Sequence, residues 1–343
     1  MYEVSEDSRE QAIKVSPNDC VVSVALVKSG TSRIIVVDGR TAPSGMQLSE
    51  LAGKLLGHDD LLGSLGGQNY QLNKVAIWKP SEGIAQFHFF NLDTNLTKII
   101  SGAECGHAAA AVGLMAILEQ STDSSERNAR VINLDTHQVI VCSPISSERF
   151  WNTLCKITVF EHEQATAPLI QTVHVDELNI ETKCCVFHHG NSFALVEGLY
   201  SCENLFVRRS ITSKVVESAR ESKRSNLGVE YVRCIPYAVE WLSSRQAVVR
   251  CRCYNSDKMH QSMPVSGAIV LCEYLSMLRL AEIGESEFSD VEESKFLFAM
   301  ESPSGREPAE VSMKKTDGEW FVESTCINSE IQLLFLCKAI LSL

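Results

Sequence analysis

The sequence predicts an α+β protein of two similar lobes, each a β-sheet wrapped around one central helix. The chain has 343 residues, which suggests about two domains. Two segments, 108–119 and 267–280, are apolar on every side, as helices buried in a core are. Each follows strand-like runs rich in Val and Ile and a loop containing glycine. We therefore expect an N-terminal lobe over 1–150 and a C-terminal lobe over 151–327, with 328–343 packing back on the first.

Hydrophobic periodicity and turn residues predict the elements of the first half. In the segment 47–56 the leucines fall on one face of a helix. In chain order we expect strands at 20–27 and 33–37, a helix at 47–56, a loop with Gly63, Gly66 and Gly67, strands at 75–78 and 85–90, a loop at 102–106, a helix at 108–119, and a hairpin of 131–134 and 138–142.

The second half repeats this style, with one basic segment, 208–224, that is either a helix or an insertion with a solvated face. Its final segment, 331–341, fits a helix or a strand. In chain order we expect strands at 156–162, 170–175, 184–187 and 193–196, a turn at Gly190-Asn191, a strand at 247–254, a polar loop at 256–266, a helix at 267–280, an acidic exposed stretch at 283–295, and strands at 296–300, 310–314 and 320–323.

Charge and composition exclude several classes of protein. The formal net charge is -12, from 43 acidic and 31 basic residues, which argues against a general nucleic-acid binder. A small anionic substrate remains compatible, because a local pocket can be positive on an acidic protein. The sequence has no run of about 18 apolar residues, and its polar, acidic start resembles neither a secretory nor a mitochondrial leader. We therefore expect a cytoplasmic protein without membrane contact.

The 13 cysteines are expected to be reduced, and most to behave as small buried hydrophobes. Those in apolar, strand-like stretches are Cys20, Cys142, Cys251, Cys253 and Cys272. Cys184-Cys185 followed by His188-His189 matches no standard zinc spacing. A plain strand is the preferred interpretation of that segment.

Cys105 is the most informative residue, because it stands where a loop becomes the first apolar helix. Unpaired N–H groups and the helix dipole stabilise negative charge there, so we expect a lowered thiol pKa and a base or nucleophile. The alternative is a cysteine buried at a helix start for packing alone. Gly106 would let a carboxylate approach the helix end, and His107 would add a hydrogen bond.

Two further segments are candidate anion-binding sites. The polar turn that includes Ser29, Gly30, Thr31 and Ser32 can present backbone N–H groups to an anion. In the second half, Ser266, Gly267 and Ala268 start the other apolar helix, and His260 lies in the polar loop before it. Ser266 is a poor base, but its hydroxyl and the N–H groups there can bind a carboxylate. Taken alone, a histidine such as His260 is more often a surface residue than a ligand-binding one.

Several short blocks occur in a characteristic order along the chain. They are Lys28-Ser29-Gly30-Thr31-Ser32-Arg33, Gly66-Gly67, Asn73-Lys74-Val75-Ala76-Ile77, Pro80-Ser81, Glu104-Cys105-Gly106-His107 with the alanines and Gly113 after it, Lys258 to Ala268, and Ser302-Pro303-Ser304-Gly305. Together these blocks resemble the PrpF family of isomerases, which have the diaminopimelate-epimerase fold. Their order and spacing agree with the family over most of the chain.

The resemblance implies a cofactor-independent and metal-independent isomerase of unsaturated di- or tricarboxylates, such as methylaconitate, methylitaconate or aconitate. It implies two diaminopimelate-epimerase-like lobes with the active site between them and both central helices pointing their N-termini at the substrate. Lys74 and Cys105 match the family's catalytic positions. The partner is then a small anionic carboxylate, with neither nucleic acid nor membrane, and a homodimer is left open.

The implied reaction removes a proton next to the unsaturated acid and returns one, through a dienolate that helix N-termini and Lys74 can stabilise. Either Cys105 as thiolate or Lys74 with a lowered pKa is the base. The family's closing Arg-Thr-Ala-Arg is replaced by Ile327-Asn328-Ser329-Glu330, which indicates a smaller or differently charged substrate, a changed reaction or reduced activity. The alternatives are a racemase or tautomerase, although Ser266 supplies no second thiol, and a non-catalytic anion-binding protein.

Overall fold

The computed structural model describes residues 19–30, 32–56, 73–92, 99–102, 104–119, 128–149, 152–160, 169–175, 180–188, 192–198, 210, 214, 233–255, 258–260, 263–283 and 291–342. Four expectations concern segments wholly or mostly outside these residues: the loop with Gly63, Gly66 and Gly67, the position of Thr31, the turn Gly190-Asn191, and the basic segment 208–224.

The elements of the first half surround helix α2, which runs through Gly106–Glu119 and is buried along most of its length. The strands and remaining helices are β1 (Asp19–Ser29), β2 (Ser32–Asp38), η1 (Gly39–Thr41), α1 (Leu48–Leu56), β3 (Lys74–Ser81), β4 (Ile84–Leu92), β5 (Ile99–Ser101), β6 (Ala129–Asn133), β7 (Val139–Arg149) and β8 (Asn152–Phe160). The predicted strands, both helices and the β6–β7 hairpin are confirmed; β5 was not predicted.

The second half surrounds helix α4, Val265–Ile283, whose first twelve residues are all buried. Its strands are β9 (Leu169–Val175), β10 (Ile180–His188), β11 (Ser192–Glu197), β12 (Arg233–Trp241), β13 (Gln246–Cys251), β14 (Tyr254–Asn255), β15 (Lys258–Met259), β16 (Glu293–Ser302), β17 (Gly305–Thr316) and β18 (Glu319–Ser342). The segment 184–188 is therefore a strand, as preferred.

Several predictions for the second half were incomplete or wrong. Strand β12 was not predicted; it contains Pro236 and yet pairs with β11 and β13. The strand expected at 247–254 is interrupted at Arg252-Cys253, and the loop expected at 256–266 contains β15. Cys272 lies in α4 and not in a strand. Cys142, Cys251 and Cys253 are free and buried, and Cys20 is free and partly exposed.

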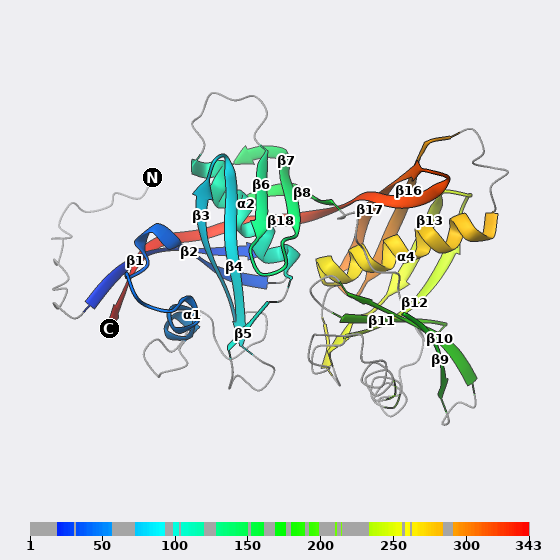
Figure 1. The fold of residues 1–343 in the computed structure, drawn as a ribbon, viewed down its shortest axis with the longest axis horizontal. Coiled ribbons are helices and arrows are strands. Elements are labelled where there is room, and N and C mark those ends of the chain that lie inside the picture. Colours follow the sequence, from blue (N-terminus) through cyan, green and yellow to red (C-terminus); the bar gives the residue numbers. More distant parts are fainter. Residues whose placement is uncertain are drawn as a thin grey trace, which may run out of the picture.

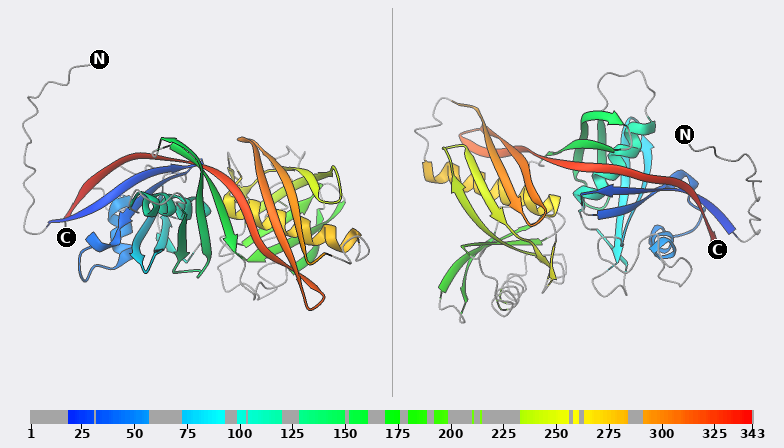
Figure 2. Two further views of the ribbon diagram at one scale, coloured as in Figure 1. Left: turned by 90° about the horizontal axis from the view of Figure 1, so that it is seen from above. Right: turned by 180° about the vertical axis from the view of Figure 1, so that it is seen from behind.

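Strand β18 is the longest element and resolves the ambiguity of segment 331–341 in favour of a strand. Its first part pairs with β17, its middle with β8, and its last part with β1, from Ser29↔Ile331 to Asp19↔Ser342. Figure 1 shows the elements in two groups, one around α2 and one around α4, with β18 running from one to the other; Figure 2 shows the same from two other sides.

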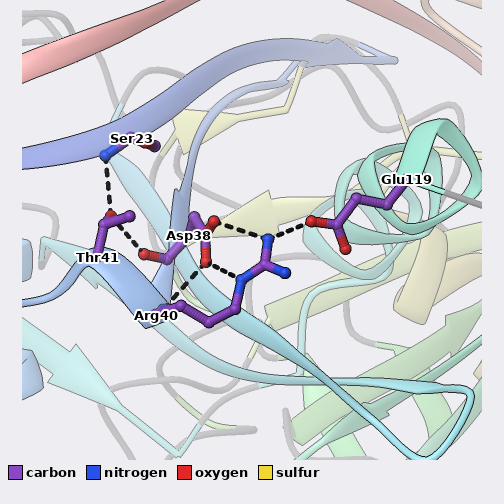
Figure 3. A network of polar contacts seen from close by, with 5 residues as sticks. All are labelled: Ser23, Asp38, Arg40, Thr41 and Glu119. Atoms are coloured by element: carbon purple, nitrogen blue, oxygen red, sulfur yellow. Dashed lines mark hydrogen bonds and ion pairs between the residues drawn. The ribbon is translucent and has the colours of Figure 1, made fainter.

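A polar network attaches the C-terminal end of α2 to the strands beside it (Figure 3). The Asp38 carboxylate accepts hydrogen bonds from Nε and Nη2 of Arg40, both at 2.8 Å, and Nη2 also donates to Glu119 at the last position of α2. Thr41 Oγ1 donates to the carbonyl of Asp38 and accepts from the N–H of Ser23. Burial raises the pKa of Asp38, but the contacts from Arg40 outweigh it and leave this pKa lowered.

Candidate active site

Cys105 caps the N-terminus of α2. Its carbonyl accepts the first helical hydrogen bond, from Ala109 N–H at 3.0 Å, and its sulfur accepts one from the N–H of Ala108. The helix itself begins at Gly106. This is the N-cap position, where an acceptor side chain satisfies a backbone donor that has no partner within the helix. The expected loop-to-helix position of Cys105 is therefore confirmed.

The N-termini of the two apolar helices touch. A Cβ built on Gly106 would lie 2.4 Å from Cγ1 of Val265, the first residue of α4, so only glycine fits there. Ser266, Gly267 and Ala268 follow Val265 in the first turn of α4 and are buried. Ser266 therefore lies inside its helix, whereas Cys105 lies just before its own.

Lys74 reaches this point from the first position of β3, which pairs in parallel with β2 at Ile34↔Lys74. Its ammonium donates a hydrogen bond to Oδ1 of Asn73 at 3.3 Å, and the Asn73 amide donates to the carbonyl of Leu92 at 2.8 Å. Lys74 and Cys105 interact electrostatically, and each keeps a partly exposed surface. The two predicted catalytic residues therefore lie close enough for each to shift the pKa of the other.

The expected lowering of the Cys105 pKa is wrong. Burial raises the pKa of this thiol, and this outweighs the opposing effects of Lys74, Ala108 N–H and Arg233. Burial also lowers the pKa of Lys74 to about 8, with Arg233 contributing and Cys105 opposing. The cause is common to both groups: desolvation penalises whichever form is charged, so it favours the thiol over the thiolate and the amine over the ammonium.

The predicted turn after β1 lies against His107. Ser32 Oγ is 3.4 Å from Nδ1 of His107, and a Cβ on Gly30 would lie only 2.6 Å from Nε2. Gly30 also has a φ of 53°, so both the backbone conformation and the nearby His107 ring favour glycine at this position. Its N–H donates to the carbonyl of Glu330 at 2.9 Å. Ser29 is fully buried and its hydroxyl is 3.5 Å from that of Ser329.

The contacts of Ser29 and Gly30 place Ser329 and Glu330 of β18 beside the turn that follows β1. Ser329 and Glu330 lie in the middle of β18 and belong to the segment 327–330, for which the sequence resemblance implied arginines. Ser329 is buried, and neither residue carries positive charge. The β18 contribution to the charge of this region is therefore different from the one that the resemblance would imply.

His260 joins the group from the second half. Its N–H donates to the carbonyl of Cys253 at 2.8 Å, and its ring interacts electrostatically with Arg233, Lys74 and His107. Burial, followed by these neighbouring charges, lowers the pKa of His260 to about 3, and burial together with Lys74 lowers that of His107 to about 4. Both imidazoles are therefore neutral near pH 7 and can donate or accept a hydrogen bond.

The sequence analysis assigned no role to two charged residues of this site. Glu104 is 7% exposed, and its carboxylate accepts hydrogen bonds from Cys105 N–H at 3.0 Å, Asn133 Nδ2 at 2.9 Å and Thr136 Oγ1 at 2.6 Å. It thereby connects the cap of α2 to the β6–β7 hairpin. The position of Glu104 directly before Cys105 could have indicated its role from the sequence. Nothing in the sequence indicated a role for Arg233, which lies at the start of the unpredicted strand β12.

Two other features are absent from the described residues, a metal-holding cluster and a membrane-crossing helix. They contain no group of three or more His, Cys, Asp or Glu side chains arranged to hold a metal ion. Within the same residues, no helix has the length and apolar character needed to cross a membrane.

Comparison with solved structures finds similar folds over nearly the whole chain. A methylitaconate Δ-isomerase superposes with a TM-score of 0.63 at 12% identity, over 95% of this chain and 96% of its own. A hydroxyproline epimerase from Agrobacterium vitis, with bound trans-4-hydroxy-L-proline, gives 0.54 at 12% identity over 95% and 93%. A probable proline racemase from Agrobacterium radiobacter, with bound carbonate, gives 0.56 at 12% identity over 92% of both chains.

No family model and no curated protein sequence matches the chain. At 12% identity the structural likeness establishes the fold and not the reaction. The chain has the diaminopimelate-epimerase-like fold that the sequence resemblance implied.

Proposed function

We propose that this protein is a cofactor-independent isomerase that moves a proton, and with it a double bond, in an unsaturated di- or tricarboxylate. The observation that carries the proposal is the meeting of Lys74 and Cys105 where the N-termini of α2 and α4 touch. An amine and a thiol beside two helix N-termini can exchange protons with a carbon acid and stabilise the anion formed. The isomerase activity in the name of one similar structure agrees with this chemistry.

The electrostatics favour one order of proton transfer. Lys74 and Cys105 form a coupled pair, and burial favours its neutral amine–thiol form over the ammonium–thiolate form. The amine of Lys74 takes the proton from the carbon next to the unsaturated acid, which leaves a dienolate and an ammonium. The thiol of Cys105 then protonates the other end of the dienolate. Proton return from ammonium to thiolate restores the pair.

The same cluster contains groups that suit the intermediate. The dienolate carries extra charge on a carboxylate, and backbone N–H groups at the starts of both helices are donors for it. Neutral His107 and His260 add hydrogen bonds without a charge of their own. Lys74, Cys105 and His107 come from the first half and His260 and Ser266 from the second, so a substrate would be bound by both.

The experiment is deuterium uptake from deuterated water into cis-aconitate, methylaconitate and itaconate, followed by NMR. We expect uptake into at least one of them, and loss of at least 100-fold in Lys74→Arg and Cys105→Ser. Cys337→Ser is the matched control, because Cys337 is an exposed thiol on β18. Absence of uptake into all three acids, or full activity in both site variants, would falsify the proposal.

The same assay separates the two alternatives. A racemase would exchange the α-proton of a saturated substrate such as proline and would need an acid on the α4 side, where Ser266 is a weak one. A non-catalytic protein would bind the acids and exchange nothing. We further propose two lobes that divide near residue 150, with β8 at the boundary because it pairs with β7 of the first lobe. Residues 331–342 belong to the first lobe because they pair with β1. We also propose a cytoplasmic location.

A further inference from the structure

Arg233 is held beside the start of α4 by a stacked contact. It is the first residue of β12, where it pairs with Phe193 of β11 on one side and Asn255 of β14 on the other. Its Cζ lies 5.9 Å from the centre of the Phe193 ring, a cation–π distance. The same ring approaches the first turn of α4, because a Cβ on Gly267 would lie 3.1 Å from its Cε1.

The charge of Arg233 acts on the site already described. Arg233 interacts electrostatically with Lys74, Cys105 and His260, and its side chain is partly exposed. Among the described residues it forms no ion pair with a carboxylate. The charge of Arg233 helps to lower the pKa of Lys74 because it disfavours the ammonium form, and a negatively charged guest would offset that effect.

Arg233 supplies a cation that the neighbouring part of β18 does not. Residues 327–330 of β18, which contact the turn after β1 through Ser329 and Glu330, carry no positive charge. The planar fork of Arg233 matches a carboxylate with two parallel hydrogen bonds, which an ammonium cannot form.

We propose that Arg233 binds the second carboxylate of the substrate, the one remote from the proton transfer, and thereby selects dicarboxylates over monocarboxylates. This inference rests on the proposed function, which places the carboxylate that carries the dienolate charge at the backbone N–H groups of the helix starts.

The test measures binding separately from turnover. Isothermal titration with itaconate and its two monomethyl esters compares the wild type with Arg233→Gln and Arg233→Lys. We expect Arg233→Gln to bind itaconate about 10- to 100-fold more weakly, and one of the two esters to bind equally to wild type and variant. Arg233→Lys should recover only part of the loss, because its ammonium replaces the charge but not the fork.

Arg250→Gln is the matched control. Arg250 lies in β13, pairs with Glu240 and Glu301 on the surface, and should leave itaconate binding unchanged. Undiminished itaconate binding in Arg233→Gln, an equal loss for itaconate and both esters, or no binding to the wild type would overturn the inference. Should Arg233→Gln not fold, Arg233→Lys carries the test, with full retention of diacid preference as the contradicting result.

The two proposals fail in distinguishable ways. Itaconate binding that depends on Arg233, without deuterium uptake into any of the three acids, would remove the isomerase function and leave the carboxylate site. Deuterium uptake that is equally fast in wild type and Arg233→Gln would retain the isomerase and remove the role of Arg233.

Discussion

Replacing Gly106 by alanine tests whether the contact between the two helix N-termini matters for activity. The new methyl group would lie 2.4 Å from Cγ1 and 2.7 Å from Cβ of Val265. Ordinary van der Waals contact begins at 3.4 Å, so the helix ends must separate by about 1 Å. Since Cys105 directly precedes Gly106, the thiol moves with the displaced end of α2.

Two magnitudes follow from this displacement. Overpacking of a buried contact costs about 1–3 kcal/mol, so we expect Gly106→Ala to lose about 2 kcal/mol of unfolding free energy. A misplacement of about 1 Å at reacting groups costs on the order of 100-fold in rate. Urea unfolding gives the first value, and kcat/KM for deuterium uptake into the active acid gives the second.

Two other glycines of the same protein supply the controls. Gly113 lies in the middle of α2, and Gly113→Ala places a methyl group 2.5 Å from the sulfur of Cys142. This variant should lose a similar unfolding free energy, while its kcat/KM in the folded protein stays within about threefold of the wild-type value. Gly53→Ala meets nothing nearer than 3.9 Å in helix α1, and should stabilise the protein by about 0.5–1 kcal/mol.

A second substitution tests the cause directly. Val265→Ala removes the methyl carbons that the new group meets, so Gly106→Ala combined with Val265→Ala should recover part of both losses, with a coupling energy of about 1 kcal/mol or more. The reasoning is refuted if Gly106→Ala keeps full activity, or if Gly113→Ala loses as much activity as Gly106→Ala does.

Three further outcomes are expected. First, kcat/KM should rise with pH around pH 8, because Lys74, whose pKa is lowered to about 8, holds its proton below that pH and cannot act as base; a pH–rate profile without this limb contradicts the assignment. Second, Glu104→Gln should lower the unfolding free energy by about 1–3 kcal/mol, since a buried donor loses its acceptor. The same variant should react faster with iodoacetamide at Cys105, because the Glu104 charge contributes to raising the pKa of that thiol. Mass spectrometry measures the labelling, and an unchanged or slower rate counts against the prediction. Third, Glu119→Gln should cost less than about 1 kcal/mol in urea unfolding, and less still at high salt, because its partner Arg40 is 48% exposed; a larger or salt-independent loss would disagree.

Much of the secondary structure could be predicted because it depends on neighbours in the chain. The apolar character of α2 and α4 on all sides, and the runs of Val and Ile in β1 and β2, are local patterns that few alternatives fit. Segment 331–341 was ambiguous for the opposite reason. A short apolar run fits a helix or a strand equally well, and its pairing with β1, about 300 residues earlier, decides the outcome.

The sequence by itself determined that Cys105 caps an apolar helix, because capping involves only the next few residues. Tertiary structure alone decided the protonation of that thiol, since burial by the rest of the protein outweighs the helix end and raises its pKa. It also placed Arg233, at the start of the unpredicted strand β12, close enough to Lys74 to lower the pKa of that lysine. Both outcomes depend on contacts between distant parts of the chain, and no local pattern encodes them.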